Sequence, residues 1–161
     1  MKKIITETEA LCRMTALCSA SEQCEHKIRE KLVKMGLDNS TIEKIILYLY
    51  DERYLDENRF ANAYAKDKLL YNKWGRVKIG QNLRMLHVSQ QSIASALDGL
   101  PETEYTSILQ SLLSSKARSV KADNDYERNM KLIRFALGRG FEMQAIRQCL
   151  PDSAETDIFD F

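Results

Sequence analysis

The sequence predicts an all-α protein made of three tandem three-helix repeats that form an elongated, curved array. Three observations predict it. Turn-forming residues are scarce, with six glycines and two prolines in 161 residues, whereas a sheet protein of this length needs more turn residues. One apolar pattern with helical spacing occurs three times along the chain. Each copy carries a residue suited to a tight turn at the same place.

The repeated apolar pattern describes a helix, a tight turn and a second helix. Residues four apart lie on one helical face, as Ile28 and Leu32 do, so the spacing indicates an amphipathic helix. The copies begin at residues 28, 79 and 132, which are 51 and then 53 residues apart. The positions in register are Ile28, Leu32, Met35, Gly36, Leu37, Ile42, Ile45 and Ile46, then Ile79, Leu83, Leu86, His87, Val88, Ile93, Ala96 and Leu97, then Leu132, Ala136, Arg139, Gly140, Phe141, Ile146, Cys149 and Leu150.

The turn in each copy is predicted from one register position. Gly36 and Gly140 stand where a helix ends in a left-handed residue, which glycine adopts without strain. His87 holds this position in the second copy, and histidine tolerates positive φ better than most residues. We therefore expect His87 to end a helix rather than to act as a base. The next apolar residue should pack back on the finished helix, namely Leu37, Val88 or Phe141.

Helix starts are predicted from capping residues. Ser40 with Glu43 fits a capping box for the last helix of the first repeat. Ser19 with Glu22 fits the same motif for the helix before it. Asp56 is the predicted N-cap of the first helix of the second repeat.

Each helix pair is preceded by a further helix, because two short helices cannot bury their apolar faces alone. The third of these helices should begin just after Pro101. The predicted organisation is therefore three bundles over residues 8–55, 56–100 and 102–150, followed by an acidic tail over 151–161.

The net charge of +1 hides an uneven distribution. Between Asn58 and Leu97, seven basic residues stand against Asp67 alone, which makes this stretch +6. Such a stretch can bind a polyanion locally, and it can equally be a solvated helix face. The basic residues are Arg59, Lys66, Lys68, Lys73, Arg76, Lys78 and Arg84.

Several functional classes lack support in the sequence. No apolar run is long enough for a membrane span, and the start is too polar for a signal peptide, so we expect a cytosolic protein. Cys12, Cys18, Cys24 and His26 lack the paired spacing of a zinc site, and we expect no metal. No phosphate-binding glycine loop or catalytic constellation is found. We therefore expect neither a cofactor nor enzymatic activity.

One segment resembles a known family. Residues 51–89 contain a tyrosine, an aliphatic residue and an acid before Arg-Phe-Ala, then a basic stretch with a glycine and an Ile-x-x-x-Leu helix. This pattern resembles the RecX family, regulators of the bacterial recombinase RecA, although His87 stands where that family usually has glycine. The third repeat, with Gly140 and Phe141, is similar to the last repeat of the family. The matching residues are Tyr54, Leu55, Asp56, Arg59, Phe60, Ala61, Lys73, Trp74, Gly75, Arg76, Ile79 and Leu83.

The resemblance implies a protein that acts by binding. Family members lodge in the groove of the filament that RecA forms on single-stranded DNA, and they hinder recombinase activity. By this resemblance we expect a monomer that binds the RecA filament, with possible direct DNA contact. The expected contacts are Arg59, Lys66, Lys73, Arg76, Lys78 and Arg84.

Alternatives remain open at this point. Trp74 is either an exposed interface anchor or a plug between helices, and we assign Tyr54 and Phe60 to the core. A stand-alone DNA-binding protein with helix-turn-helix motifs is the second hypothesis. A helical-repeat scaffold for another protein is the third.

Overall fold

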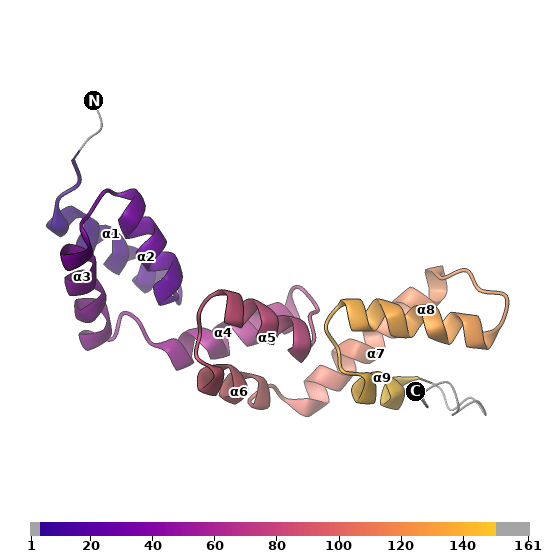
Figure 1. Cartoon of the computed structure of the whole chain (residues 1–161). Coiled ribbons are helices and arrows are strands. Elements are labelled where there is room, and N and C mark those ends of the chain that lie inside the picture. The colour runs from indigo at the N-terminus through magenta and orange to yellow at the C-terminus, as the bar shows by residue number, and fades with distance from the viewer. Residues whose placement is uncertain (1–3, 151–161) are drawn as a thin grey trace. The chain divides into compact units, whose positions relative to one another are not determined.

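The computed structural model describes residues 4–150, and it contains nine helices and no strand in that range (Figure 1). The prediction of an all-α protein is therefore confirmed. No helix within 4–150 is both long and apolar enough to cross a bilayer. The helices are α1 (Glu7–Ala20), α2 (Glu25–Lys34), α3 (Asn39–Asp51), α4 (Glu57–Leu70), α5 (Arg76–Met85), α6 (Gln90–Asp98), α7 (Glu102–Ser119), α8 (Asp125–Gly138) and α9 (Met143–Cys149).

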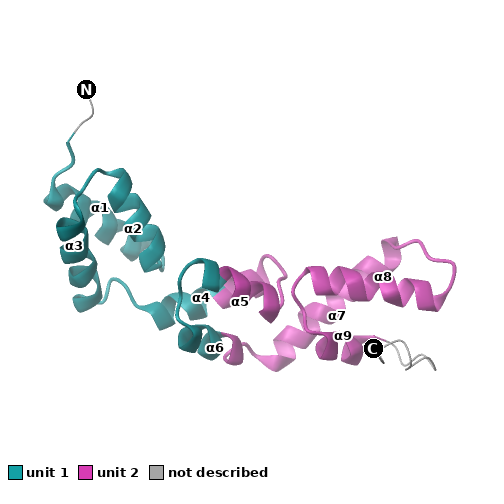
Figure 2. Cartoon of the chain, in the orientation of Figure 1, with its two compact units in different colours: residues 1–64, 83–96 teal, residues 65–82, 97–161 magenta. Residues whose placement is uncertain are grey.

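The chain divides into two compact units (Figure 2). Within the described residues, the first unit contains residues 4–64 and 83–96, and the second contains 65–82 and 97–150. The boundary passes through α4, α5 and α6, so residues of the second repeat belong to both units.

The first unit is built around the apolar faces of α1, α2 and α3. Ile28 and Leu32, which define the start of the repeated pattern, are fully buried. They pack with Met14 of α1 and with the isoleucines of α3. The cluster consists of Ala10, Met14, Ile28, Leu32, Ile42, Ile45, Ile46, Leu49 and Leu55. Burial of each such aliphatic side chain contributes roughly 1.5–3 kcal/mol.

The second unit contains the bundle of α7, α8 and α9, which pack on one another. Its largest buried side chains are those of Tyr105 and Phe141, whose ring centroids lie 5.2 Å apart. Leu109, Leu132 and Ile146 complete this core. Phe141 follows the turn glycine and is buried, as predicted.

The three turns have the predicted conformation. The φ angles of Gly36, His87 and Gly140 are 82°, 62° and 89°. In each turn the backbone N–H of this residue donates to the carbonyl three residues earlier, at 2.9, 3.0 and 2.9 Å respectively. The repetition of this hydrogen bond shows that the three segments share one turn geometry.

The capping boxes were predicted wrongly. Helix α3 begins at Asn39 because Asp38 is its N-cap, with a carboxylate oxygen that accepts from the N–H of Thr41 at 2.8 Å. Ser40 therefore lies inside the helix. Helix α1 continues to Ala20 and the N-cap of α2 is Cys24, so Ser19 caps nothing. Aspartate and serine both favour the N-cap position of a helix. Helix α3 begins after the aspartate, which stands two residues before the serine.

Asp56 and Phe60 of the second repeat, and Tyr54 at the end of the first, were also assigned roles from the sequence. Asp56 does cap α4, since its carboxylate accepts from the N–H of Arg59 at 2.8 Å. The side chains of Tyr54 and Phe60 are only half-buried, although we assigned both to the core. Tyr54 packs against the edge of the cluster in the first unit. The ring of Phe60 lies beside that of Tyr64, at a centroid distance of 5.7 Å.

Candidate functional site

The basic part of the second repeat centres on the segment that joins α4 to α5, which we call the Trp74 turn (residues 71–75). Helix α4 ends at Leu70, and the N–H of Trp74 reaches back to the carbonyl of Lys68 at 3.1 Å. Lys73 adopts a left-handed conformation with φ of 58°, and its ammonium donates to the carbonyl of Leu70. This lysine therefore closes the C-terminal end of α4, where a cation is favoured by the helix dipole.

The backbone that follows the turn is anchored on the third repeat, within the second unit. The N–H of Gly75 donates to the carbonyl of Arg139 at 2.8 Å, and that of Val77 donates to the carbonyl of Gly140 at 2.9 Å. These N–H groups lie at the start of α5, where a helix has no internal acceptors for them. A Cβ atom on Gly75 would lie 2.4 Å from the carbonyl oxygen of Gly140. The close approach of the two backbones thus requires glycine.

Arg76 extends this anchorage with its side chain, which is only 18% exposed. Its Nη1 lies 3.1 Å from Oε2 of Glu142, and its Nη2 lies 2.7 Å from Oε1 of Glu102. Its Nε donates to the carbonyl of Leu97 at 3.3 Å. The guanidinium also lies 4.0 Å from the centroid of the Tyr105 ring. With these partners satisfied, Arg76 is a structural link rather than a free cation.

Tyr105 connects the backbone of α5 to the same carboxylate. Its hydroxyl accepts from the N–H of Arg76 at 3.0 Å and donates to Oε1 of Glu142. Burial, followed by the hydrogen bond to Glu142, raises the pKa of the Tyr105 phenol above its ordinary value. The phenol therefore remains protonated and available as a donor. We call Arg76, Glu102, Tyr105 and Glu142 the Arg76 clamp.

The six predicted contact residues have different environments. Arg59 is engaged in the first unit, where its side chain pairs with Glu22 and donates to the carbonyl of Arg53 at 3.0 Å. Lys66 on α4 and Arg84 on α5 are exposed and form no ion pair within the described residues. Lys73 and Lys78 are half-buried beside Trp74, in the second unit. The structure thus brings Lys73, Trp74 and Lys78 together, places Arg59 and Arg84 in the other unit, and gives Arg76 the structural partners described above.

The side chain of Trp74 is half-buried, so its burial does not decide between the two alternatives considered from the sequence. Ammonium groups lie over its ring from both neighbouring helices, with Lys68 at 5.0 Å and Lys78 at 4.7 Å from the ring centroid. Such pairs are attracted by the negative face of the indole. Next to it, Tyr71 is 79% exposed and Val77 is 46% exposed. The turn and the start of α5 therefore present an exposed aromatic and an exposed apolar side chain close in sequence to Trp74 and its two lysines.

Tyr71 and the clamp partners of Arg76 were not predicted from the sequence, and Lys68 was counted among the basic residues but not among the expected contacts. Tyr71 and Lys68 lie within residues 51–89, the segment that resembles the family. They could have been identified as candidate contacts there, because one side chain is aromatic and the other is basic. Glu142 could have been found from the repeat register, since it stands where the other repeats have the capping residues Asp38 and Ser89, whereas Glu142 makes no side-chain cap. Its link to Arg76 spans 66 residues, and no local pattern shows it.

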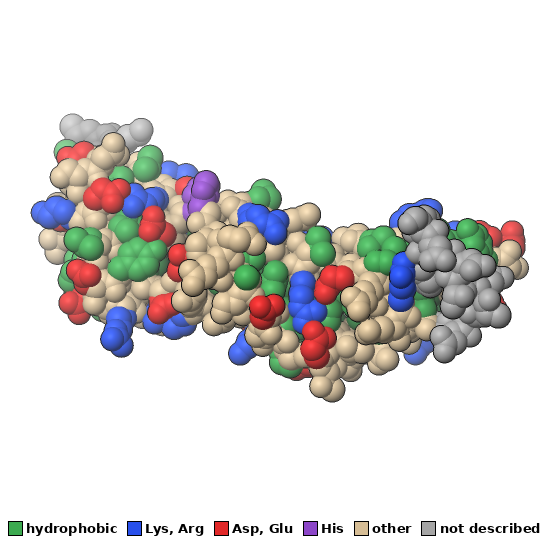
Figure 3. Space-filling model, turned by 60° about the horizontal axis from the view of Figure 1, so that its bottom comes forward, with side chains coloured by type: hydrophobic (Ala, Val, Ile, Leu, Met, Phe, Trp, Pro, Cys, Tyr) green, Lys and Arg blue, Asp and Glu red, His purple; other side chains and the backbone are tan. Residues whose placement is uncertain are grey.

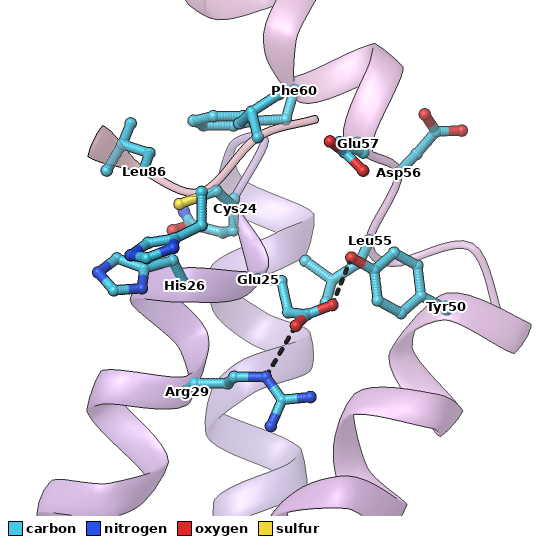
Figure 4. A pocket seen from close by; sticks show the side chains of 13 residues that line it. Cys24, Glu25, His26, Arg29, Tyr50, Leu55, Asp56, Glu57, Phe60 and Leu86 are labelled. Carbon is cyan, nitrogen blue, oxygen red and sulfur yellow. Dashed lines mark hydrogen bonds and ion pairs between the residues drawn. The ribbon is translucent and has the colours of Figure 1, made fainter. Parts of the chain in front are cut away.

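A second candidate site is a cavity of about 250 Å³ in the first unit (Figure 4). Glu25 lies in it and accepts from Arg29 and from the hydroxyl of Tyr50, both at 2.8 Å. The rings of His26 and His87 lie side by side at the rim, with centroids 4.2 Å apart. In Figure 4, Glu25 is paired with Arg29 and with Tyr50, so these three polar groups already have partners.

The cysteines do not gather with other ligands. Cys12 is exposed, Cys18 and Cys149 are half-buried, and Cys24 is buried. No group of three potential metal ligands is found among residues 4–150. Figure 3 shows one face of the molecule, on which basic and acidic side chains are interspersed. The local cluster of cations at the Trp74 turn is therefore the more informative feature.

Two family models match the chain. Residues 56–97 match the second three-helix domain of RecX, and residues 102–150 match the third three-helix domain of RecX. All residues of the Trp74 turn and of the Arg76 clamp lie within these two matched regions.

Similar curated proteins carry the same family name. The chain is 30% identical to "Regulatory protein RecX" of Prosthecochloris aestuarii, over 89% of this chain and 93% of that protein. It is 28% identical to the protein of that name from Clostridium botulinum strain Alaska E43, over 98% of this chain and 76% of that protein. The crystal structure of RecX from Lactobacillus salivarius is similar in fold, with a TM-score of 0.80 at 17% identity, over 89% of this chain and 93% of that one.

Proposed function

Because this chain belongs to the RecX family of regulatory proteins, we propose that it binds RecA and its filament on single-stranded DNA, and that it thereby restrains recombinase and ATPase activity in the bacterial cytoplasm. The proposal includes no catalytic step, and binding alone supplies the effect. The observation that carries it is the Trp74 turn with the start of α5, where Tyr71 and Val77 are exposed and the ammonium groups of Lys68 and Lys78 lie over the ring of Trp74.

The chemistry of this turn suits a surface that contains both protein and DNA. Exposed Tyr71 and Val77 can pack on an apolar patch of a partner, and aromatic residues are common energetic anchors of interfaces. Lys66 and Lys73 can approach phosphates, which adds affinity that falls as salt rises. Tyr71 also offers a ring on which an unpaired base can stack. We propose a monomer that uses repeats 8–55, 56–100 and 102–150 for several contacts at once, so that individually weak contacts act together.

The predicted contacts now have two roles. We propose that Lys66, Lys73, Lys78 and Arg84 contact the partner. Arg76 instead positions the turn, because its guanidinium is occupied by Glu102 and Glu142. Arg59 is likewise bound to Glu22, so we assign it a structural role. A guanidinium with carboxylate partners would have to give up those bonds before binding a phosphate.

Stand-alone recognition of duplex DNA is the weaker alternative. A helix that reads the major groove needs exposed basic and polar side chains. Helix α6 contains no basic residue, and the one lysine of α3, Lys44, lies 3.6 Å from the carboxylate of Glu7. The last helices of these two repeats therefore lack the cations that groove reading requires.

The experiment is a titration of the protein into RecA-coated single-stranded DNA, with ATP hydrolysis and strand exchange followed together. We expect both activities to fall as the protein approaches stoichiometry with RecA. Unchanged activities at stoichiometric amounts would contradict the proposal. Tight binding to duplex DNA without RecA, measured by gel shift, would favour the alternative.

A matched pair of variants tests the site. Lys66→Glu with Lys73→Glu reverses one cation of α4 and one of the Trp74 turn, and we expect inhibition to weaken by roughly tenfold or more, which corresponds to about 1.4 kcal/mol. Lys27→Glu with Lys44→Glu makes the same change in net charge on the first repeat, where both lysines form surface ion pairs. Such pairs contribute little to stability, and this variant should inhibit normally. Equal inhibition by both variants would reject the assigned site.

A further inference from the structure

A second surface lies on the first repeat, where α1 and α2 leave an open groove of about 620 Å³. Ala16 and Ala20 are exposed on α1, and their short side chains leave this space unfilled. Leu17 and Met35 are half-buried there, and Met14 lies beneath them. The groove thus has an apolar floor made of flexible and small side chains. It belongs entirely to the first unit and contains no residue of the Trp74 turn.

The rim of the groove is positive and unpaired. Among residues 4–150, its charged residues are Arg13, Lys31 and Lys34, and none of its lining residues is acidic. These three cations form no ion pair within residues 4–150. The other cations of α1, α2 and α3, by contrast, do have carboxylate partners. Those are Lys27 with Glu30, Arg29 with Glu25 and Glu43, and Lys44 with Glu7.

The distinction between the paired and the unpaired cations is informative because this part of the chain is acidic. Between Glu7 and Glu57, eleven acidic residues stand against seven basic ones, a net charge of −4. Carboxylates are therefore abundant, yet all of the unpaired cations of the three helices border one apolar groove. A partner that supplies carboxylates there would gain charge-assisted contacts at the rim while it buries apolar side chains in the floor.

We propose that this groove binds a short acidic segment of a partner protein, one that carries two or three large apolar side chains between aspartates or glutamates. Methionine and leucine in the floor can adapt to different apolar side chains. The arrangement suits an amphipathic segment that lies along a groove. The groove is separate from the Trp74 turn, because none of its lining residues belongs to that turn.

Two other polyanions fit the groove less well. Single-stranded nucleic acid would supply phosphates, but its bases bind by stacking on aromatic rings, and the part of the groove lining that the structure describes contains no aromatic side chain. An anionic membrane binds through apolar side chains that project from the surface. The larger apolar side chains here do not project from the surface, because Leu17 and Met35 are half-buried and Met14 is buried.

The test uses the full-length chain and a fluorescein-labelled peptide of about ten residues in which aspartates alternate with leucine and phenylalanine. Fluorescence anisotropy should show binding in the range of about 1–100 μM. A peptide with lysines in place of the aspartates, and one with serines in place of the apolar residues, should each bind at least roughly tenfold more weakly. No binding of the acidic apolar peptide at millimolar protein would overturn the proposal.

Variants of the chain locate the site. Lys31→Glu with Lys34→Glu should weaken peptide binding by roughly tenfold or more, and Ala20→Trp should do so by filling the groove. Lys27→Glu with Lys44→Glu, which has the same net charge as the first double variant, should bind the peptide as the wild type does. Circular dichroism and thermal unfolding verify that each variant is folded.

Two outcomes would assign the groove to another occupant and would overturn the proposal. One is that a fluorescent single-stranded oligonucleotide binds more tightly than the peptide and loses affinity in Lys31→Glu with Lys34→Glu. The other is concentration-dependent self-association of the chain that the same variant abolishes, which would make the occupant a second copy. Equal peptide binding by the two double variants would also refute the assigned site.

Discussion

Nη1 of Arg76 lies 3.1 Å from Oε2 of Glu142, a residue that occupies the helix-capping position of its repeat. The equivalent residues Asp38 and Ser89 cap α3 and α6 with their side chains. Glu142 leaves the start of α9 without a side-chain cap and reaches Arg76 and Tyr105 instead. The second unit therefore uses a capping position to fix the segment that follows the Trp74 turn.

Replacement of Arg76 by glutamate should destabilise the protein, although the basic stretch alone suggests a harmless surface change. The substitution would place a third carboxylate beside Glu102 and Glu142, and it would leave Glu142 half-buried without its cation. Loss of one partner from such a pair costs about 3–5 kcal/mol when the pair is buried, and somewhat less at partial exposure. Urea unfolding followed by circular dichroism measures the loss. Lys66→Glu, at an exposed site, should change stability by less than about 0.5 kcal/mol.

The glycine requirement at the clamp can be tested with alanine. Gly75→Ala and Gly140→Ala would place a Cβ within 2.4 Å of the Gly140 carbonyl oxygen and 2.3 Å of the Lys78 Cβ, so we expect each to cost several kcal/mol. Gly138→Ala meets no atom within 4 Å and lies at the end of α8, where alanine should be neutral or stabilising by about 0.5–1 kcal/mol. Thermal unfolding of the three variants gives the comparison. Equal midpoints would show that the two backbones do not approach so closely.

The second unit should lose stability at alkaline pH through Tyr105. Its phenol has an ordinary pKa of 10.0, and burial together with the Glu142 hydrogen bond raises that pKa in the folded chain. A group whose pKa is higher in the folded than in the unfolded protein contributes its full stability at pH values below the unfolded-state pKa. That contribution is lost as the pH rises toward the folded-state pKa. The stability should therefore fall above about pH 10.

Tyr105→Phe isolates this contribution. The variant should be less stable at neutral pH by about 1–3 kcal/mol, because Glu142 and the Arg76 N–H lose a partner. Its stability should then fall less steeply between pH 9 and pH 11 than that of the wild type, in urea unfolding curves measured across that range. Tyr126→Phe changes an exposed phenol of α8 and should retain the wild-type slope. The same slope in all three proteins would exclude Tyr105 as the titrating group.

The single tryptophan of the chain reports on the proposed interface. Trp74 is half-buried beside Lys68 and Lys78, so a partner that covers the turn should change its solvent exposure and its contacts with these ammonium groups. We expect a shift of its emission when RecA-coated single-stranded DNA is added, and a smaller response at high salt. The intrinsic fluorescence of a tryptophan-free RecA variant provides the background. Inhibition without any change in Trp74 emission would place the interface elsewhere.

The sequence alone determined the features that depend on local chemistry. The apolar spacing of Ile28 and Leu32 predicts a helical face, and the structure buries both. The left-handed turns at Gly36, His87 and Gly140 follow from the conformational freedom of those residue types. The all-α class and the family resemblance were found in the same way, because helix faces and turns involve neighbours within a few residues.

The tertiary structure alone decided which cations are available. Lys66 and Arg76 are both basic residues of the same stretch of sequence. In the structure, however, Lys66 is exposed whereas Arg76 is bound to Glu102, Glu142 and Tyr105. Nothing near Arg76 in the chain predicts these partners, since Glu142 lies 66 residues away. A cation is free or occupied according to which carboxylates the fold places within a few ångströms, and that distance is set by the packing of helices remote in sequence.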